Sequence, residues 1–277
     1  MSKLESAFLK AMRKEQPEVP MNNGLCEGWF EKPNKPVSET PEKRNIFSSR
    51  KQILGMSQDR FFSVEDFTSK RLIFSSMSDK LLLNKYRNLR TKLLETCPKG
   101  NSNFVTLVTS VVPQGGASLI ATNLAIAFAF DGSKTATLVD ADIKNQQLSK
   151  LLGVKPKIGL TEYLESEDCD TSEVLYKTAI PRLRFVPSGL DRENASEYFT
   201  SDKMKNFLSE LIKRYPDRYP IIDAPSISQS ADTQILIEQC DKIVLVIPYG
   251  KCTEEEISYA AITIGKEKLA GVVLNQF

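Results

Sequence analysis

The sequence predicts an α/β protein in which a doubly wound, mostly parallel sheet carries helices on both faces. Short apolar runs alternate along the chain with longer segments whose apolar residues recur at helical spacing, and this alternation is typical of βαβ units. The runs are apolar on both faces, as strands inside a parallel sheet are. We expect strands at 104–109, 135–139, 183–187, 219–223, 242–248 and 271–275.

The segments between the apolar runs predict helices with recognisable starting residues. Residues 78–95 place Leu82, Tyr86, Leu89 and Leu93 on one stripe, as in a helix packed on a core. Ser201 is a candidate N-cap for a helix over 201–214. Thr253 and Glu256 have the spacing of a capping box and open a helix over 254–264. A run of small residues predicts a further helix over 118–130.

The N-terminal quarter of the chain differs in character from the rest. Residues 1–14 predict an amphipathic helix, because Leu4, Phe8 and Met12 repeat every four residues among basic ones. This helix either docks on a partner or covers the protein's own core. Residues 15–77 predict a flexible linker or extension, partly disordered, since residues 15–51 are rich in proline and charge. Phenylalanines in its second half suggest some packing. We expect one domain over residues 78–277.

Composition excludes several classes of function. The chain of 277 residues carries a net charge of +2 and has no histidine, so Ser-His and Cys-His nucleophile pairs are excluded. Its five cysteines have no CxxC spacing, which favours free thiols in a reduced compartment. The longest near-apolar run, residues 119–130, is shorter than the roughly 20 residues that a spanning helix needs. We expect a soluble protein that reaches a membrane only through a partner.

The stretch from Phe104 to Ala129 has the layout of a phosphate-binding loop. An apolar strand meets a turn with Pro113, Gly115 and Gly116, and a helix follows. Backbone N–H groups of such a turn surround a phosphate at the positive end of the helix. The candidate nucleotide-binding residues are Gln114, Gly115, Gly116, Ala117 and Ser118. The motif calls for lysine before the serine, but this chain has alanine there. Taken alone, the glycines are equally consistent with a tight strand-to-helix turn that binds no ligand.

Three carboxylates come at the ends of later strands. Asp140 and Asp142 follow one apolar run, and Asp223 ends another. In an open parallel sheet, ligands bind outside the carboxyl ends of the strands, where these residues and the glycine turn meet. Carboxylate and hydroxyl oxygens suit Mg²⁺. The candidate metal ligands are therefore Ser118, Asp142 and Asp223.

These motifs resemble those of the bacterial tyrosine kinases, relatives of the MinD/ParA P-loop ATPases, over about residues 81–277. The family's loop reads here as residues 113–118 (PQGGAS), followed by the family's Asn-Leu-Ala at 123–125. Its two acidic motifs read as residues 138–144 (LVDADIK) and 221–226 (IIDAPS). The resemblance implies a cytoplasmic protein that uses ATP or ADP with Mg²⁺. It also implies a membrane partner, a polysaccharide co-polymerase or chain-length determinant.

The resemblance also assigns roles to single residues and exposes departures. Asp140 and Asp142 match catalytic positions, and Asn275 is a candidate contact to the adenine base. Arg87 and Arg90 match arginines that assemble the family into rings, but their acidic partner is replaced by Asn84. The tyrosine cluster that the family autophosphorylates has no counterpart here.

The departures lead to three functional hypotheses. The first is a degenerate kinase-like protein with weak nucleotide binding, little phosphoryl transfer and a regulatory role in exopolysaccharide synthesis or export. The second is an active tyrosine autokinase that takes its cation from Lys144 or from another protomer. The third is a MinD/ParA-type ATPase; against it, this chain also lacks the signature lysine of that group's loop.

Overall fold

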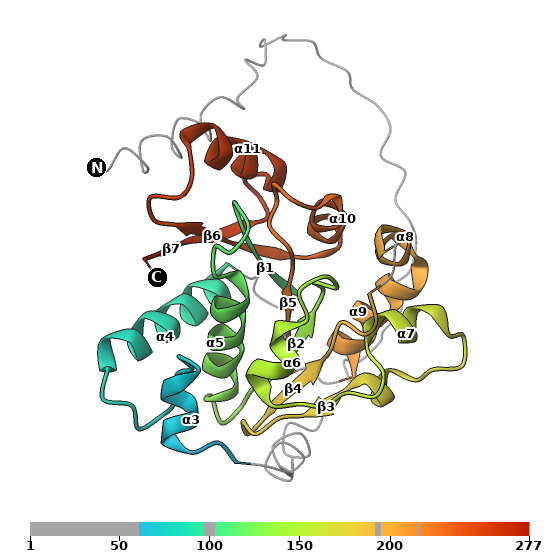
Figure 1. Ribbon diagram of the computed structural model, residues 1–277, viewed down its shortest axis with the longest axis horizontal. Coiled ribbons are helices and arrows are strands. Elements are labelled where there is room, and N and C mark those ends of the chain that lie inside the picture. The colour runs from blue at the N-terminus through green and yellow to red at the C-terminus, as the bar shows by residue number, and fades with distance from the viewer. Residues whose placement is uncertain (1–60, 97–102, 192–194, 215–216, 277) are drawn as a thin grey trace, which may run out of the picture.

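The computed structural model describes residues 61–96, 103–191, 195–214 and 217–276. These residues form a seven-stranded sheet with helices on both faces (Figure 1), so the predicted α/β fold class is confirmed. The helix predicted over residues 1–14 and most of the linker predicted over 15–77 lie outside the described residues. None of the described helices combines the length and the hydrophobicity needed to cross a membrane.

The sheet has the strand order β3-β4-β2-β5-β1-β6-β7. Neighbouring strands run parallel except for the β3/β4 pair, which is antiparallel. All the predicted strands are found within two residues of the expected bounds, and the two-residue β3 is additional, because so short a strand has no visible period. The strands are β1 (Thr106–Ser110), β2 (Thr135–Asp140), β3 (Tyr176–Lys177), β4 (Leu183–Val186), β5 (Arg218–Asp223), β6 (Lys242–Pro248) and β7 (Leu269–Asn275).

Each face of the sheet has its own apolar core. Adjacent residues of β1 enter different cores, Leu107 one and Val108 the other, because side chains alternate along a strand. One core is covered by α3 (Val64–Ser69), α4 (Lys80–Glu95), α5 (Ala117–Ala129) and α6 (Gln147–Leu152). The other is covered by α7 (Leu160–Glu165), the 3₁₀ turn η1 (Thr171–Val174), α8 (Ala195–Thr200), α9 (Asp202–Lys213), α10 (Ala231–Gln239) and α11 (Glu254–Ile264).

Helix α5 follows the glycine turn and is the most enclosed helix among the described residues. From Ile120 to Ala129 every residue is buried, because the sheet covers one side and α4 packs beside the other (Figure 1). Its C-terminal carbonyls are capped from outside the helix. Arg90 Nη1 donates to Ala127 O and Arg182 Nε donates to Ala129 O, both at 2.7 Å. Such contacts satisfy carbonyls that a helix end leaves unpaired.

The contact of Arg90 bears on the predicted ring assembly. Its guanidinium is partly buried and holds α5, whereas Arg87 on the same helix is exposed. Arg90 therefore has a role within the chain, and an oligomer contact through Arg90 stays a prediction. An oligomer contact through Arg87 stays a prediction.

The boundary predicted at residue 78 is corrected by the structure. Residues 61–77 contain α3, which begins with a capping box between Ser63 and Asp66, and they bury Leu72 and Ile73. The side chain of Asn123 of α5 holds this segment by two hydrogen bonds. Its Oδ1 accepts from Ile73 N at 2.8 Å, and its Nδ2 donates to Arg71 O at 3.1 Å. This part of the predicted linker is therefore packed on α5.

Candidate functional site

The loop between β1 and α5 holds a conformation that requires its glycines. Gly116 caps α5 with φ of 89°, a left-handed conformation that glycine adopts without strain. A Cβ at Gly116 would collide with the amide of Asn275, and one at Gly115 with the Ser110 side chain. Gln114 has φ of 57°, which is uncommon for a residue with a side chain. The sequence therefore builds a sharp turn at the mouth of α5.

Asn275 ends β7 and braces this turn. Its side chain is buried, and Nδ2 donates to Gly115 O at 2.8 Å. The amide thus fixes the loop from behind and lies outside the residues that line the adjacent cavity. The contact that the structure gives Asn275 is a positioning one, and its predicted contact with an adenine base stays a prediction.

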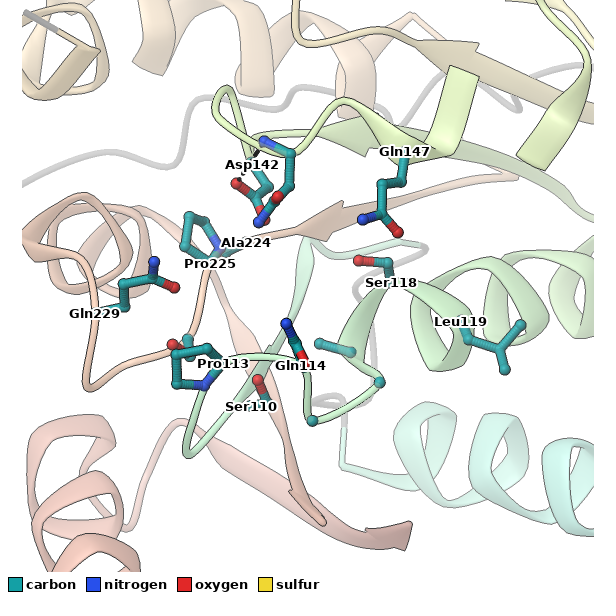
Figure 2. A pocket seen from close by; sticks show the side chains of 15 residues that line it. Ser110, Pro113, Gln114, Ser118, Leu119, Asp142, Gln147, Ala224, Pro225 and Gln229 are labelled. Atoms are coloured by element: carbon teal, nitrogen blue, oxygen red, sulfur yellow. Dashed lines mark hydrogen bonds between the residues drawn. The ribbon is translucent and has the colours of Figure 1, made fainter. Parts of the chain in front are cut away.

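A cavity of about 590 Å³ opens at the carboxyl ends of the strands. Its size falls in the range of about 300–1,000 Å³ that small-molecule sites have. Figure 2 shows Gln114, Ser118 and Asp142 around it, with the amides of Gln147 and Gln229 extending toward it. The lining residues are Ser110, Pro113, Gln114, Gly115, Gly116, Ala117, Ser118, Leu119, Asp142, Asn145, Gln147, Ala224, Pro225, Ser226 and Gln229. Five of the six residues predicted to contact the nucleotide belong to this lining, and the sixth, Asn275, does not.

The other two predicted carboxylates lie behind the cavity wall. Asp140 and Asp223 end neighbouring strands and stand in register with each other, and both are buried. Asp140 Oδ1 accepts from Asp142 N at 3.2 Å. Asp223 accepts a hydrogen bond from the Ser118 side chain, which links the end of β5 to the first turn of α5. Of the predicted metal ligands, Ser118 and Asp142 line the cavity, and Asp223 is buried behind it.

Burial raises the pKa of each of these carboxyl groups. The pKa of Asp140 is raised well above its usual value by burial and, next, by the charges of Asp223 and Asp142. Burial raises the pKa of Asp223 to about 7, against the opposing hydrogen bond from Ser118. Burial also raises the pKa of Asp142, although hydrogen bonds from Asn145 oppose the shift. Clustered carboxyl groups with raised pKa values indicate a functional site.

Several buried oxygens in the cavity wall and directly behind it lack a hydrogen-bond partner among the described residues. Asp140 Oδ2, Asp223 Oδ1 and Ser226 Oγ have no hydrogen-bond partner in the described part of the chain. A buried polar atom without a partner costs free energy, so each is a place where a cation or its water shell would be stabilised. Among the described residues no three His, Cys, Asp or Glu side chains are grouped so that they could hold a metal ion, and a Mg²⁺ ion beside the phosphates of a nucleotide stays a prediction.

No lysine or arginine is among the described residues that line the cavity. Ala117 stands where the phosphate-binding motif carries its lysine, and it belongs to the lining of the cavity. Lys144, considered as a substitute, is exposed and lies outside the lining. The site therefore has the shape of a phosphate-binding loop without its cationic side chain.

Sequence reasoning missed the amide and hydroxyl groups of the lining. Asn145 and Gln147 follow Asp142 closely, and Ser226 and Gln229 follow Asp223. They sit in loops and at a helix start, where no period marks them. Their place directly after strands that end in aspartate was the available signal, because that edge of a parallel sheet is where ligands bind.

Solved structures with the same fold define the class. The kinase domain of Escherichia coli tyrosine kinase ETK aligns with a TM-score of 0.65 at 21% identity, covering 78% of this chain and 87% of that one. The cell division ATPase MinD of Pyrococcus furiosus aligns with a TM-score of 0.54 at 21% identity, covering 63% and 72%. At these identities the likeness concerns the fold, which is that of the MinD-like P-loop ATPases.

Sequence relatives define the family within this class. The tyrosine-protein kinase CpsD of Streptococcus agalactiae is 34% identical over 180 residues, or 64% of this chain and 77% of the relative. The tyrosine-protein kinase YwqD of Bacillus subtilis is 31% identical over 204 residues, or 72% and 84%. The chain belongs to the bacterial tyrosine kinase family.

Other relatives are much longer than this chain. The tyrosine-protein kinase ptk of Acinetobacter johnsonii is 29% identical over 201 residues, which are 72% of this chain but 26% of the relative. The chain thus spans about a quarter of that protein. No protein-family model matches the chain.

Proposed function

We propose that this chain is a degenerate bacterial tyrosine kinase that binds a nucleotide weakly and transfers phosphoryl groups little or not at all. One observation carries the proposal. The cavity keeps the loop, the Ser118 hydroxyl and Asp142, with Asp140 and Asp223 buried behind its wall, while no cationic side chain lines it among the described residues. The loss is therefore specific to the charge that would meet the phosphates.

The physical consequence differs for binding and for chemistry. A hydrogen bond to a charged group contributes about 1.5–3 kcal/mol, and backbone N–H groups of the loop still offer contacts to a phosphate. Loss of one preorganised contact to the transition state costs on the order of 10²–10³ in rate. Phosphoryl transfer depends mostly on positioning and charge stabilisation. Binding of ATP or ADP with Mg²⁺ therefore survives in part, and catalysis falls further.

The remaining residues keep roles that do not need the lysine. Ser118, Asp142 and Asp223 would hold the Mg²⁺ ion, directly or through water. Asp140 would shape the site or accept the proton of a tyrosine hydroxyl. When bound, the metal would neutralise phosphate charge. The buried amide of Asn275 keeps the loop open for the phosphates by its hydrogen bond to Gly115.

The biological role we propose is regulatory. Membership of the family supports a cytoplasmic protein that docks on a membrane polysaccharide co-polymerase and regulates exopolysaccharide synthesis or export. In that role the folded nucleotide site acts as a sensor or a scaffold. A pull-down with the cytoplasmic segments of such a co-polymerase tests the partner, and absence of binding contradicts it.

The kinase test is incubation of the purified chain with Mg-ATP followed by detection of phosphotyrosine. The proposal predicts no signal above that of the Asp142→Asn variant. Strong autophosphorylation of the wild type that Asp142→Asn abolishes would defeat the proposal.

Two alternative functions, an active tyrosine autokinase and a MinD-type ATPase, can be distinguished from this one by experiment. An active autokinase would draw its cation from Lys144, which is exposed two residues beyond Asp142, or from a second protomer. A MinD-type ATPase would share the fold that the comparison with MinD shows. Radiolabelled ATP separates them, because an autokinase leaves label on the protein and an ATPase releases it as inorganic phosphate.

A further inference from the structure

A cavity of about 400 Å³, here called the α4/α5 groove, lies between α4, the first turns of α5 and residues 68–79. Its apolar lining consists of Leu72, Phe74, Met77, Leu82, Tyr86 and Leu119. Three of these side chains, Phe74, Leu82 and Leu119, are only partly buried by the described residues. Leu119 also lines the cavity of the glycine loop, and Figure 2 shows it extending away from Ser118. The groove is therefore distinct from the candidate nucleotide site.

The polar groups of the groove already have partners or face solvent. Asn123 Nδ2 donates to Tyr86 Oη at 3.4 Å, and Asp79 Oδ1 accepts from Leu82 N at 2.9 Å. Within the described ranges, none of the buried side-chain nitrogens and oxygens that lack a partner belongs to this lining. Its two charged residues, Arg71 and Asp79, are exposed. A polar metabolite is bound through convergent polar groups, so this groove fits apolar side chains better.

The N-terminal part of the chain joins the described residues beside the groove. Thr68 of α3 belongs to the lining, and it follows Phe61, where the description begins, by seven residues. Seven residues span at most about 25 Å. Residues 15–60, which are 46 residues, separate Phe61 from the segment 1–14. A flexible chain of that length has an average end-to-end distance of about 35–40 Å, so the segment 1–14 is within reach of the groove.

Residues 1–14 carry an apolar pattern that suits such a groove. Leu4, Phe8 and Met12 recur every four residues, which places them on one face of a helix. Amphipathic helices bind hydrophobic grooves through anchors at this kind of spacing. Residues 15–51 contain five prolines and therefore offer no comparable helical stripe.

We propose that residues 1–14 dock in the α4/α5 groove of their own chain, with Leu4, Phe8 and Met12 as the anchors. The docked segment would cover the partly buried side chains of Phe74, Leu82 and Leu119. The tether favours the chain's own segment over that of a second copy, because it holds the segment near the groove at an effective concentration that is roughly millimolar. Of the two roles left open for this predicted helix, the groove thus favours packing on the protein itself.

The test is photo-crosslinking of the full chain with benzoylphenylalanine placed at position 8. This aromatic side chain bonds under ultraviolet light to C–H groups that it touches, and mass spectrometry locates the products. We expect links to Met77, Leu82 or Leu119. A mixture of ¹⁵N-labelled and unlabelled protein separates links within one chain from links between two chains.

Two variants with the same introduced charge test whether the groove is responsible. Leu82→Asp places a carboxylate in the lining and should lower the docking equilibrium constant by about 10–100-fold, and with it the yield of the links to Met77 and Leu119. Leu81→Asp is the matched control, because Leu81 is the preceding residue of α4 but is 69% exposed and lies outside the lining. Its yield should equal that of the chain without the substitution. Thermal unfolding checks that both variants are folded.

Each other outcome overturns the inference. Links to the groove of another molecule would make a second copy the occupant. Absence of links, or links only to other surfaces, would leave the groove to an apolar segment of a partner protein. A yield that Leu82→Asp does not lower, or that Leu81→Asp lowers equally, would show that the groove does not hold the segment. The crosslinks of the chain changed only at position 8 decide the matter even if Leu82→Asp does not fold, and they are independent of nucleotide binding.

Discussion

The raised pKa of Asp223 makes the stability of the ligand-free protein depend on pH in a definite direction. Burial raises this pKa from 3.8 to about 7, so between these values the folded state holds a proton that the unfolded state has released. The contribution of this group to the free energy of unfolding is therefore fully present below about pH 3.8 and is progressively lost as the pH rises toward 7. Each unit of pH in this window costs about 1.4 kcal/mol, or about 2 kcal/mol between pH 5 and pH 7 once the final part of the titration levels off. Asp140 and Asp142 shift in the same direction.

Urea unfolding followed by circular dichroism at several pH values measures this effect. In Asp223→Asn the group is neutral at every pH, and its repulsion of Asp140 is removed. The variant should therefore lack the pH-dependent loss that the wild type shows. The difference in the free energy of unfolding, variant minus wild type, should become more positive by about 2 kcal/mol from pH 5 to pH 7. Asp202→Asn, which changes an exposed carboxylate of α9, is the control and should keep the wild-type slope. The reasoning is refuted if wild-type stability is constant or increases over this range, or if Asp223→Asn has the same slope.

Three further predictions follow from contacts of α5 and its loop. Asn123→Ala removes the hydrogen bonds that hold residues 61–77 against α5. It should lower the free energy of unfolding by about 2–4 kcal/mol and speed proteolysis of that segment. An unchanged rate of cleavage would contradict this role of Asn123. Gly116→Ala places a Cβ against the Asn275 amide and should abolish ADP binding measured by calorimetry. The double variant that also carries Asn275→Ala should recover part of this binding. Normal ADP binding by Gly116→Ala alone would show that the loop has another conformation. Arg90→Ala should lower the free energy of unfolding by about 1–2 kcal/mol through the lost cap of α5, whereas exposed Arg87→Ala should change it by less than about 0.5 kcal/mol; equal effects would remove the distinction.

The parallel sheet and its site could be predicted because they depend on local patterns. Apolar runs such as 242–248 match the strand bounds without error, since a strand buried on both faces leaves an unbroken run. The glycine turn and the strand-end aspartates converge because the topology of a parallel sheet brings the carboxyl ends of its strands to one edge. No long-range contact had to be known.

The parts that were not predicted depend on contacts between distant elements. Asn275 holds Gly115 from 160 residues away, and no local pattern distinguishes such a brace from a ligand contact. Arg90 was matched to an assembly residue, and its hydrogen bond to a carbonyl of α5 is a further contact that no local pattern marks. Residues 61–77 include a helix of six residues, too short to show a period, so their packing was visible only as scattered phenylalanines.

The measurement that tests the central claim most directly is the affinity for Mg-ADP of the wild type and of Ala117→Lys, compared in parallel titrations. A cavity complete except for one positive side chain predicts measurable binding by the wild type and binding tighter by about 10-fold or more in the lysine variant. If neither protein binds Mg-ADP, or if both bind with the same affinity, the missing charge at position 117 is not what limits this site.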